Sequence, residues 1–239
     1  MSSILVIADL HLEPTRPDIT ECFIEFLSQR KEHHALYILG DLFEVWVGDD
    51  LQDEFTIKIA KAINTFSQHT PVYFIHGNRD FLLRNKFAKS CGMSLLPEQH
   101  QIEAFGKSIV FMHGDQLCLD DVNYQKFRKK SRSWWWQAFI LALPLKVRKN
   151  IARKYREQSL NSQMEKSQDI MDVAERAVKA CFEQTNCDYL IHGHTHRPAI
   201  HQIENGQKRI VVGDWYEQGS FLEISEQEAV LHSLSFTKQ

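Results

Sequence analysis

Five short apolar stretches of this chain each end in side chains that can bind a metal ion. These ends carry, in chain order, Asp9 and His11, Asp41, Asn78, His113, and His194 and His196. Each stretch is rich in β-branched or aromatic residues over four to six positions, which is typical of a buried strand. Because α/β proteins place their sites in loops at the carboxyl ends of strands, we expect these side chains to form one site.

The chemical types of these side chains favour a catalytic metal centre. They offer carboxylate, imidazole and amide groups but no thiolate, which excludes a structural zinc site and suits Mn²⁺, Fe²⁺ or Zn²⁺ in an open centre. Seven ligands are too many for one ion and suit two. Two metal ions about 3.5–4 Å apart serve phosphoryl chemistry, because they activate water and hold the attacked phosphate.

Each of these motifs alone has an ordinary structural explanation. A single Asp-x-His or Gly-Asp after a strand is usually a turn or a helix cap. The pair His194 and His196 is a stronger signal, because alternate residues of an extended chain face the same way. Five such ends in one chain are difficult to attribute to turn chemistry.

Strands alternating with helices must position these side chains. Strands are expected within residues 4–12, 35–46, 71–82, 107–117 and 187–198, helices over 19–30 and 55–68, a helical block over 120–185, and closing antiparallel strands within 208–225 and 228–236. This alternation favours an α/β fold. We find no linker or repeat, so we expect a single domain over residues 1–239, with residues 120–185 as a helical insertion.

Composition restricts the possible functions. With 43% hydrophobic and 25% charged residues and a net charge of −3, the 239-residue chain is neither disordered nor a general nucleic-acid binder. Residues 126–156, however, carry eleven Lys or Arg and no Asp or Glu, which indicates a local anionic partner. Five scattered cysteines suit free thiols in a reducing compartment, and no signal peptide is expected at the N-terminus.

The most unusual segment begins with three tryptophans, Trp134–Trp136, and continues into a basic stretch. A membrane span, a buried core helix and a surface for an apolar, anionic partner are all conceivable. The apolar run from Trp134 to Leu145 would rise roughly 18 Å as a helix, against about 30 Å for a hydrocarbon core. Pro144 also interrupts it, so we do not expect a membrane span.

The order D-x-H, GD, GN, H, GH-x-H resembles that of the calcineurin-like metallophosphoesterases, whose α/β fold is a β-sandwich flanked by helices. The resemblance implies two metal sites that share Asp41 and activate a hydroxide as the nucleophile. It implies that Asp9, His11, Asp41 and His196 hold one metal, and that Asp41, Asn78, His113 and His194 hold the other.

One departure from the family pattern points to the substrate. Most members have GNH[DE] at the third motif, where the histidine is taken as a general acid, but here the motif is GNRD, with Arg79. Arginine cannot give up a proton at neutral pH. A phosphate leaving group, with a pKa of about 6, needs no acid, whereas an alkoxide does. We therefore expect a pyrophosphate substrate, with Asp41 and Arg79 as catalytic residues and Arg79 stabilising the phosphoryl charge.

Further motifs, among them LYILGDLFE, YFIHGNRDFLL and LIHGHTHRPA, resemble a subfamily that hydrolyses UDP-2,3-diacylglucosamine in the lipid A pathway. This resemblance covers nearly the whole chain, including the insertion. It implies UMP and 2,3-diacylglucosamine 1-phosphate as products, and two Mn²⁺ per chain, with Fe²⁺ or Zn²⁺ as alternatives. It also implies a peripheral protein on the cytoplasmic face of the inner membrane.

The same resemblance implies a set of substrate contacts. They are Asn78, Arg79, Asp121, Ser159, Gln163, Lys166 and His194. Gln163 stands where the subfamily usually has Asn or Asp. Without the resemblance, the residues at 159, 163 and 166 would be interpreted as a solvated helix face. Plausible acyl-chain contacts, which could equally be core residues, are Trp46, Phe81, Leu82, Leu83 and Phe139.

Within this interpretation the tryptophan segment is expected to be an amphipathic lid that shelters acyl chains. Its basic residues would meet lipid headgroups or substrate phosphates; they are Lys146, Arg148, Lys149, Arg153 and Lys154. A helix packed on the core with a solvated basic face is the alternative.

Two other functions remain open. One is a metal-dependent phosphodiesterase acting on nucleic acid or nucleotides, which the separation of basic from aromatic residues disfavours. The other is a membrane-binding module with a structural metal, which the absence of thiolate ligands disfavours.

Overall fold

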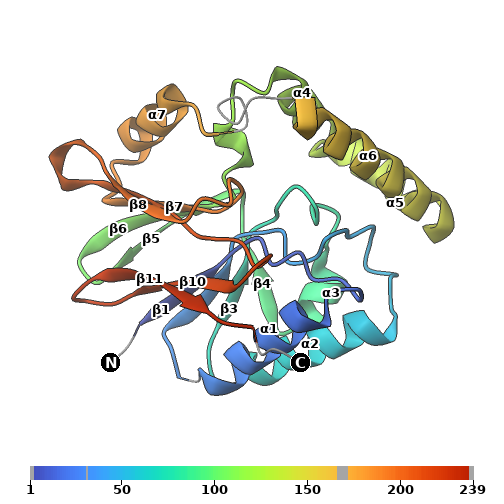
Figure 1. The fold of residues 1–239 in the computed structure, drawn as a ribbon, viewed down its shortest axis with the longest axis horizontal. Coiled ribbons are helices and arrows are strands. Elements are labelled where there is room, and N and C mark those ends of the chain that lie inside the picture. The colour runs from blue at the N-terminus through green and yellow to red at the C-terminus, as the bar shows by residue number, and fades with distance from the viewer. Residues whose placement is uncertain (1–2, 31, 166–171, 237–239) are drawn as a thin grey trace.

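Two β-sheets lie face to face, with helices on both outer sides (Figure 1). The computed structural model describes residues 3–30, 32–165 and 172–236, apart from the side chains of residues 158–165. This arrangement is an α/β sandwich flanked by helices, as the sequence predicts.

The first sheet holds six strands in the order β11-β10-β1-β2-β3-β4. Their bounds are β1 Ile4–Ile7, β2 Ala35–Ile38, β3 Val72–Phe74, β4 Met93–Leu95, β10 Gly219–Ile224 and β11 Ala229–Leu234. Strands β1 to β4 are parallel, and β10 pairs antiparallel with both β1 and β11. The carboxyl ends of β1, β2 and β3 therefore lie along one edge of the sheet.

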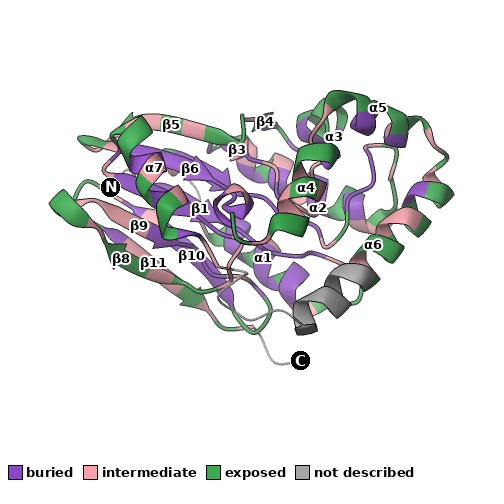
Figure 2. Cartoon of the chain, turned by 90° about the horizontal axis from the view of Figure 1, so that it is seen from above, coloured by how far each residue is buried: buried purple, intermediate pink, exposed green. Residues whose placement is uncertain are grey.

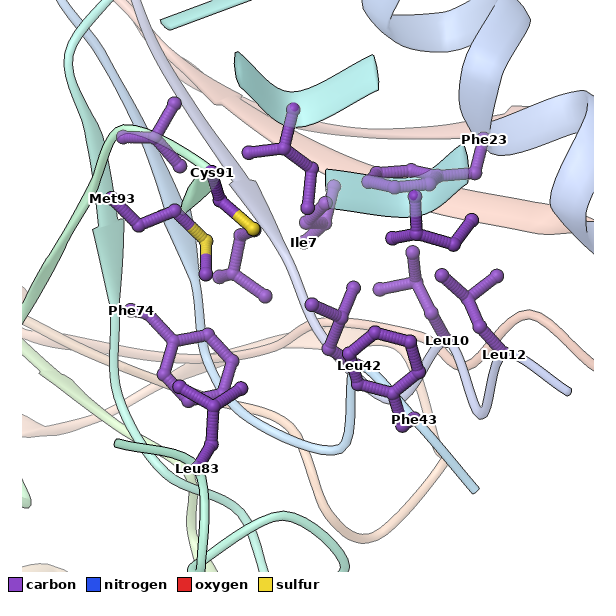
Figure 3. Packing of buried hydrophobic residues seen from close by; sticks show 14 of the residues in the cluster. Ile7, Leu10, Leu12, Phe23, Leu42, Phe43, Phe74, Leu83, Cys91 and Met93 are labelled. Carbon is purple, nitrogen blue, oxygen red and sulfur yellow. The ribbon is translucent and has the colours of Figure 1, made fainter. Parts of the chain in front are cut away.

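Three helices cover the outer face of this sheet: α1 (Pro17–Gln29), α2 (Glu54–Ser67) and α3 (Asn85–Ser90). The helix expected over residues 19–30 is confirmed as α1, and its Ile19, Phe23, Phe26 and Leu27 are buried. Figure 3 shows part of this core, in which Phe23 lies near the side chains of β1 and its following loop.

The second sheet holds five strands in the order β5-β6-β7-β9-β8. Their bounds are β5 Gln99–Ala104, β6 Lys107–Met112, β7 Tyr189–His192, β8 Ala199–Gln202 and β9 Lys208–Val211. Strand β7 pairs parallel with β6 and β9. Antiparallel strands are expected within 208–225, and the structure has two there: β9, which is antiparallel to β8 and parallel to β7, and β10, which is antiparallel to β1 and β11. They belong to different sheets, because the loop around the fully buried Trp215 carries the chain from one sheet to the other.

Apolar side chains from both sheets fill the space between them, including Val6, Leu39, Phe111 and Ile191. The inner strands β1 and β6 are accordingly drawn as mostly buried in Figure 2, whereas the outer strands β5 and β8 are intermediate or exposed. Because both faces of β1 and β2 are covered, these strands are apolar throughout rather than alternating, as expected for parallel strands buried on both sides.

Four helices connect β6 to β7: α4 (Val122–Ser131), α5 (Trp134–Ala142), α6 (Leu145–Glu165) and α7 (Glu175–Thr185). Short 3₁₀ turns η1 (Asp115–Leu117) and η2 (Glu204–Gly206) complete the chain. Pro144 separates α5 from α6. No helix in the described residues is long and apolar enough to span a membrane.

The three tryptophans of α5 divide between core and solvent. Trp136 and Ile140 are buried in the same core cluster as α1, whereas Trp134 is 81% exposed, Trp135 53% and Phe139 61%. The segment is therefore neither wholly core nor wholly surface. One side of α5 packs against the core, and the other side exposes large apolar side chains to solvent.

Arg148, expected to meet lipid headgroups or substrate phosphates, is buried and attached to the body of the protein. Its guanidinium pairs with Asp50 and donates hydrogen bonds to the carbonyl oxygens of Val47 and Leu143. Contact with lipid headgroups was wrongly expected for this residue, because its counter-ion lies about one hundred positions away in the chain. Contact with substrate phosphates stays a prediction, since Arg148 lines the cavity that also contains the metal-ligand cluster. Lys146, Lys149, Arg153 and Lys154 are exposed, as expected.

Replacing Arg148 with methionine should destabilise the protein. The change keeps the aliphatic bulk but leaves two carbonyl oxygens and Asp50 without their donor, which costs about 1.5–3 kcal/mol in the free energy of unfolding. Urea denaturation measures this loss. Arg153→Met is the matched control, because Arg153 makes only an exposed pair with Glu157 and should leave stability unchanged. Equal stability of the two variants would contradict the anchoring role.

Candidate metal centre

The structure brings all seven expected ligands together where five strand ends meet. Strands β1, β2 and β3 supply the first three ends, and β6 and β7 of the other sheet supply the rest. Ligand atoms of Asp9, His11 and His196 lie within 4.8 Å of one another, as do those of Asp9, Asp41 and His113.

The two remaining expected ligands, Asn78 and His194, surround His113. Its Nε2 atom lies 2.9 Å from Asn78 Oδ1 and 3.2 Å from His194 Nδ1. On the other side, His11 Nε2 and His196 Nε2 are 3.4 Å apart. The ligands thus form two adjacent groups.

Asp41 lies between these two groups. Its Oδ1 atom is 3.8 Å from His113 Nε2, and its Oδ2 atom is 3.9 Å from His11 Nε2. Oδ1 also accepts a hydrogen bond of 2.8 Å from the backbone N–H of Arg79. Each carboxylate oxygen therefore faces a different histidine.

The backbone at the centre is held in an uncommon conformation. Five of the expected ligands have left-handed backbone angles: Asp9 (φ 54°), His11 (50°), Asp41 (51°), His194 (69°) and His196 (56°). Such angles are infrequent in residues other than glycine and persist where surrounding contacts enforce them. Backbone hydrogen bonds do so here, since the N–H of Asp9 donates to Gly40 and that of His11 donates to Asp41.

Two glycines give the carboxylates room. A Cβ atom at Gly77 would lie 2.1 Å from Asp41 Oδ1, and one at Gly193 would lie 2.2 Å from Asp9 Oδ2. Both distances are far below van der Waals contact. Gly77 in the GN motif and Gly193 in the HGH motif are therefore required, because the backbone at these positions lies too close to the two carboxylates for any side chain to fit.

The residues present fit a pair of divalent metal ions. Asp9 is fully buried, and although its Oδ2 accepts a hydrogen bond from the backbone N–H of His194, its Oδ1 has no hydrogen-bond partner among the described residues. A buried carboxylate oxygen without a donor is expected where a cation binds. His113 Nδ1 lies 2.7 Å from the carbonyl oxygen of Leu39, to which it can donate, leaving Nε2 facing the centre.

The charges of the centre shift its pKa values. Burial, reinforced by the charge of His113, lowers the pKa of His194 to about 4, so this imidazole is neutral and can bind a metal at pH 7. Burial opposes protonation of His196 as well, but Asp9 outweighs it and raises the pKa of His196 to about 8. Burial and the charge of Asp41 raise the pKa of Asp80 to about 7.

Two charged residues that the sequence interpretation missed also contact the centre. Glu44 Oε2 lies 3.0 Å from His11 Nδ1, and its Oε1 pairs with Arg156 of α6 and lies 3.7 Å from Arg79 Nη1. Glu44 could have been predicted from the sequence, because it follows the expected ligand Asp41 by only three residues. Arg156 could be found only from helical spacing, which places it on one face of α6 with Arg148 and Ala152.

A cavity of about 710 Å³ extends from the metal-ligand cluster to the space beneath α4, α5 and α6. Its apolar part is lined by Val45, Trp46, Val47, Phe81, Leu82, Phe127, Trp136, Ile140, Ile151 and Tyr155. Trp46, Phe81 and Leu82 were among the expected acyl contacts. Leu83 is instead fully buried in the core, and Phe139 lies on the outer surface of α5.

The expected substrate contacts reach this cavity only in part. Asn78, Arg79, Asp121 and His194 line it, and Asp121 also caps α4 by accepting a hydrogen bond from the N–H of Tyr124. Lys166 and the side chains of Ser159 and Gln163 lie outside the described residues.

Gly193→Ala should weaken metal binding. Its Cβ would displace Asp9, so we expect the affinity for Mn²⁺, measured by isothermal titration calorimetry, to fall at least about tenfold. Gly206→Ala is the control, because nothing lies within 4 Å of its Cβ and its positive φ affects only the η2 turn. Unchanged affinity in Gly193→Ala would show that Asp9 does not hold the ion.

Comparison with known proteins agrees with this geometry. Residues 2–198 match the family model described as calcineurin-like phosphoesterase. Proteins named UDP-2,3-diacylglucosamine hydrolase are similar over nearly the full length. That of Shewanella piezotolerans is 52% identical, covering 98% of this chain and 99% of its own, and that of Shewanella frigidimarina is 48% identical, covering 100% and 99%.

Solved structures show the same fold at low identity. A novel archaeal phosphodiesterase has a TM-score of 0.52 at 12% identity, covering 97% of this chain and 99% of its own. A Vps29 mutant from Entamoeba histolytica has a TM-score of 0.50 at 16% identity, covering 97% and 91%. The chain therefore belongs to the calcineurin-like phosphoesterase family, in the group whose members are named UDP-2,3-diacylglucosamine hydrolase.

Proposed function

We propose that this protein hydrolyses the pyrophosphate bond of UDP-2,3-diacylglucosamine, giving UMP and 2,3-diacylglucosamine 1-phosphate. The observation that carries this proposal is the single cavity that joins a cluster of metal-ligating side chains to an apolar chamber. A substrate with a pyrophosphate next to two acyl chains needs both environments at once. The names of the full-length relatives agree with it.

We assign the metal ligands to two Mn²⁺ ions that share Asp41. Asp9, His11, Asp41 and His196 would hold one ion, and Asp41, Asn78, His113 and His194 the other. The two oxygens of Asp41, which face different histidines, support the shared role. Oxygen and nitrogen donors without thiolate suit Mn²⁺, and also Fe²⁺ or Zn²⁺. Such ions would supply a water of lowered pKa and neutralise phosphate charge.

Arg79 is placed to stabilise the phosphoryl group rather than to donate a proton. Its side chain is 15% exposed, lines the cavity, and has a buried Nε–H without a hydrogen-bond partner among the described residues. A guanidinium with unused donors binds phosphate oxygens well, yet stays protonated at every physiological pH. The leaving group of a pyrophosphate needs no proton, so this residue is compatible with the proposed bond cleavage.

The remaining substrate contacts would come from α4 and α6. Asp121 lies at the start of α4, within the cavity wall. On α6 the cavity is lined at Ile151, Ala152, Tyr155 and Arg156. Ser159 follows Tyr155 by four residues and Gln163 by eight, so helical spacing places both positions on the same face of α6. We propose that these residues, with Lys166 beyond them, bind the polar part of the lipid substrate.

The outer side of α5 has the composition of a membrane contact. Trp134, Trp135 and Phe139 are exposed, and exposed Lys146 and Lys149 follow at the start of α6. Tryptophan beside lysine is favoured where apolar side chains insert among anionic headgroups. We propose that this surface attaches the protein to the cytoplasmic face of the inner membrane, close to the chamber that would receive the acyl chains.

Metal-loaded protein should release UMP from UDP-2,3-diacylglucosamine, and chelation should abolish the reaction. Asp41→Ala and His113→Ala should lower kcat by at least about 100-fold, because each removes a proposed metal ligand itself rather than a residue that only orients a ligand. Chromatography of the released UMP measures the rate.

The exposed position Lys179 on α7 provides the control, and Lys179→Met should retain full activity. Hydrolysis of a simple dialkyl phosphate as fast as the pyrophosphate would contradict the leaving-group argument for Arg79. UMP release that survives both ligand substitutions would contradict the metal assignment.

Replacing Trp134 and Trp135 together with serine should weaken binding to vesicles containing anionic lipid. Both rings are exposed, so the fold and the Mn²⁺ affinity should not change. Sedimentation with vesicles measures the binding. Trp136 is left intact, because this ring is buried and its loss would destabilise α5. If the double variant sediments with vesicles as well as the wild type does, the proposal that α5 contacts the membrane is wrong.

A further inference from the structure

A second, smaller hollow of about 190 Å³ opens beside the metal centre. It shares Asp172, Thr195 and Arg197 with the large cavity, so the two are continuous. Thr195 lies between the ligands His194 and His196. The hollow therefore begins at the metal centre, and five of its eight lining residues carry polar side chains.

Alternate residues of β8 and β9 form its floor. Ala199 and His201 of β8 pair directly with Val211 and Arg209 of β9, and all four line the hollow. The intervening Ile210 is buried between the two sheets, so the floor belongs to the outer face of the second sheet. The position is thus fixed by sheet register rather than by a loop.

Arg209 is the charge on this floor. Its guanidinium is half-buried, and burial lowers its pKa. Its nearest polar side-chain contact is His192, with Nη1 3.3 Å from the imidazole Nε2. The charge of Asp172, which lines the same hollow, partly offsets this effect of burial. A guanidinium has five N–H donors, so Arg209 can offer donors to a ligand in the hollow.

Arg197 and Asp172 also line the hollow. Arg197 Nη1 donates a hydrogen bond of 2.8 Å to Asp172 Oδ2, and both side chains remain partly exposed. Together with Arg209, the hollow offers two guanidinium donors and one carboxylate acceptor. Uracil presents the complementary edge, in which the N3–H donor lies between the O2 and O4 acceptors. Cytosine does not, because its N3 is an acceptor and its 4-position carries a donor.

We propose that this hollow is the uracil subsite, in which Arg197, Asp172 and Arg209 recognise the base of the nucleotide. The assignment rests on the proposed hydrolysis of UDP-2,3-diacylglucosamine. A volume of about 190 Å³ is below the roughly 300–1,000 Å³ of pockets for whole drug-sized ligands, so it suits a planar base with the ribose and phosphate outside. Enzymes that bind a single base also recognise it through its pairing edge.

Binding of UMP and CMP to the Mn²⁺-loaded protein tests the subsite. Wild-type protein should bind UMP at least about tenfold more tightly than CMP, because a mismatched edge leaves polar groups unpaired. Arg209→Met should weaken UMP binding about tenfold and remove the preference. Asp172→Asn, at a partly exposed position where folding is not at risk, should remove the preference as well.

Lys208→Met is the matched control, because Lys208 precedes Arg209 on β9 and stacks on Tyr189 rather than lining the hollow. It should keep the preference for UMP. Arg209→Met should bind 2,3-diacylglucosamine 1-phosphate as wild type does, since Arg209 does not line the large cavity.

Two results would overturn the subsite: equal binding of UMP and CMP by the wild type, or an unchanged preference in both Arg209→Met and Asp172→Asn. The proposed hydrolysis of the lipid substrate is tested independently of the base subsite. A wild-type enzyme that releases UMP from the lipid but shows no base preference overturns the subsite alone. A wild type that prefers UMP but does not hydrolyse the lipid supports the subsite and overturns the proposed function.

Discussion

The structure depends on keeping two buried carboxylates, Asp9 and Asp41, next to each other. Both are almost completely removed from water, where like charges repel strongly. The protein compensates with backbone N–H groups, which donate to Asp9 from His194 and to Asp41 from Arg79, and with the histidines around them. The left-handed backbone at five ligands and the glycines at 77 and 193 follow from this requirement, because they allow the strand ends to approach so closely.

Internal ion pairs hold the helical segment against this centre. Arg128 donates to the buried carboxylate of Asp115, Arg132 donates to the carbonyl oxygen of Gly77, and Arg148 pairs with Asp50. Since Gly77 touches Asp41 and Asp115 follows His113 by two residues, the same contacts that fasten the helices also support the metal ligands. The basic charge of the segment is therefore divided between these internal contacts and an exposed surface.

The sequence predicted the local features of the site well. The apolar strands with ligands at their ends, and the face of α1, are encoded within a few residues of each other. The pairing of β9 with β7, the contact of Glu44 with His11 and the burial of Arg148 depend on partners far away in the chain. The periodicity and spacing of residues within a segment do not show which distant segment it will contact, so these features could not be predicted. Trp134 and Trp136 differ in burial for a similar reason, since only packing against the core decides which side of α5 is covered.

The position of the metal centre within the cavity also has a consequence for which phosphorus is attacked. The apolar chamber is lined by residues of α5 and α6 such as Trp136 and Ile151, whereas the polar hollow is lined by Thr195, between His194 and His196, and by residues of β8 and β9. If the acyl chains of the substrate lie in the apolar chamber and its uracil lies in the polar hollow, the pyrophosphate that joins them lies at the metal centre. In this proposed binding mode the uridine-linked phosphate would lie nearest His194 and His196, and the lipid-linked phosphate would lie toward the chamber. Such a mode would favour attack on the uridine side, with the lipid phosphate as the leaving group.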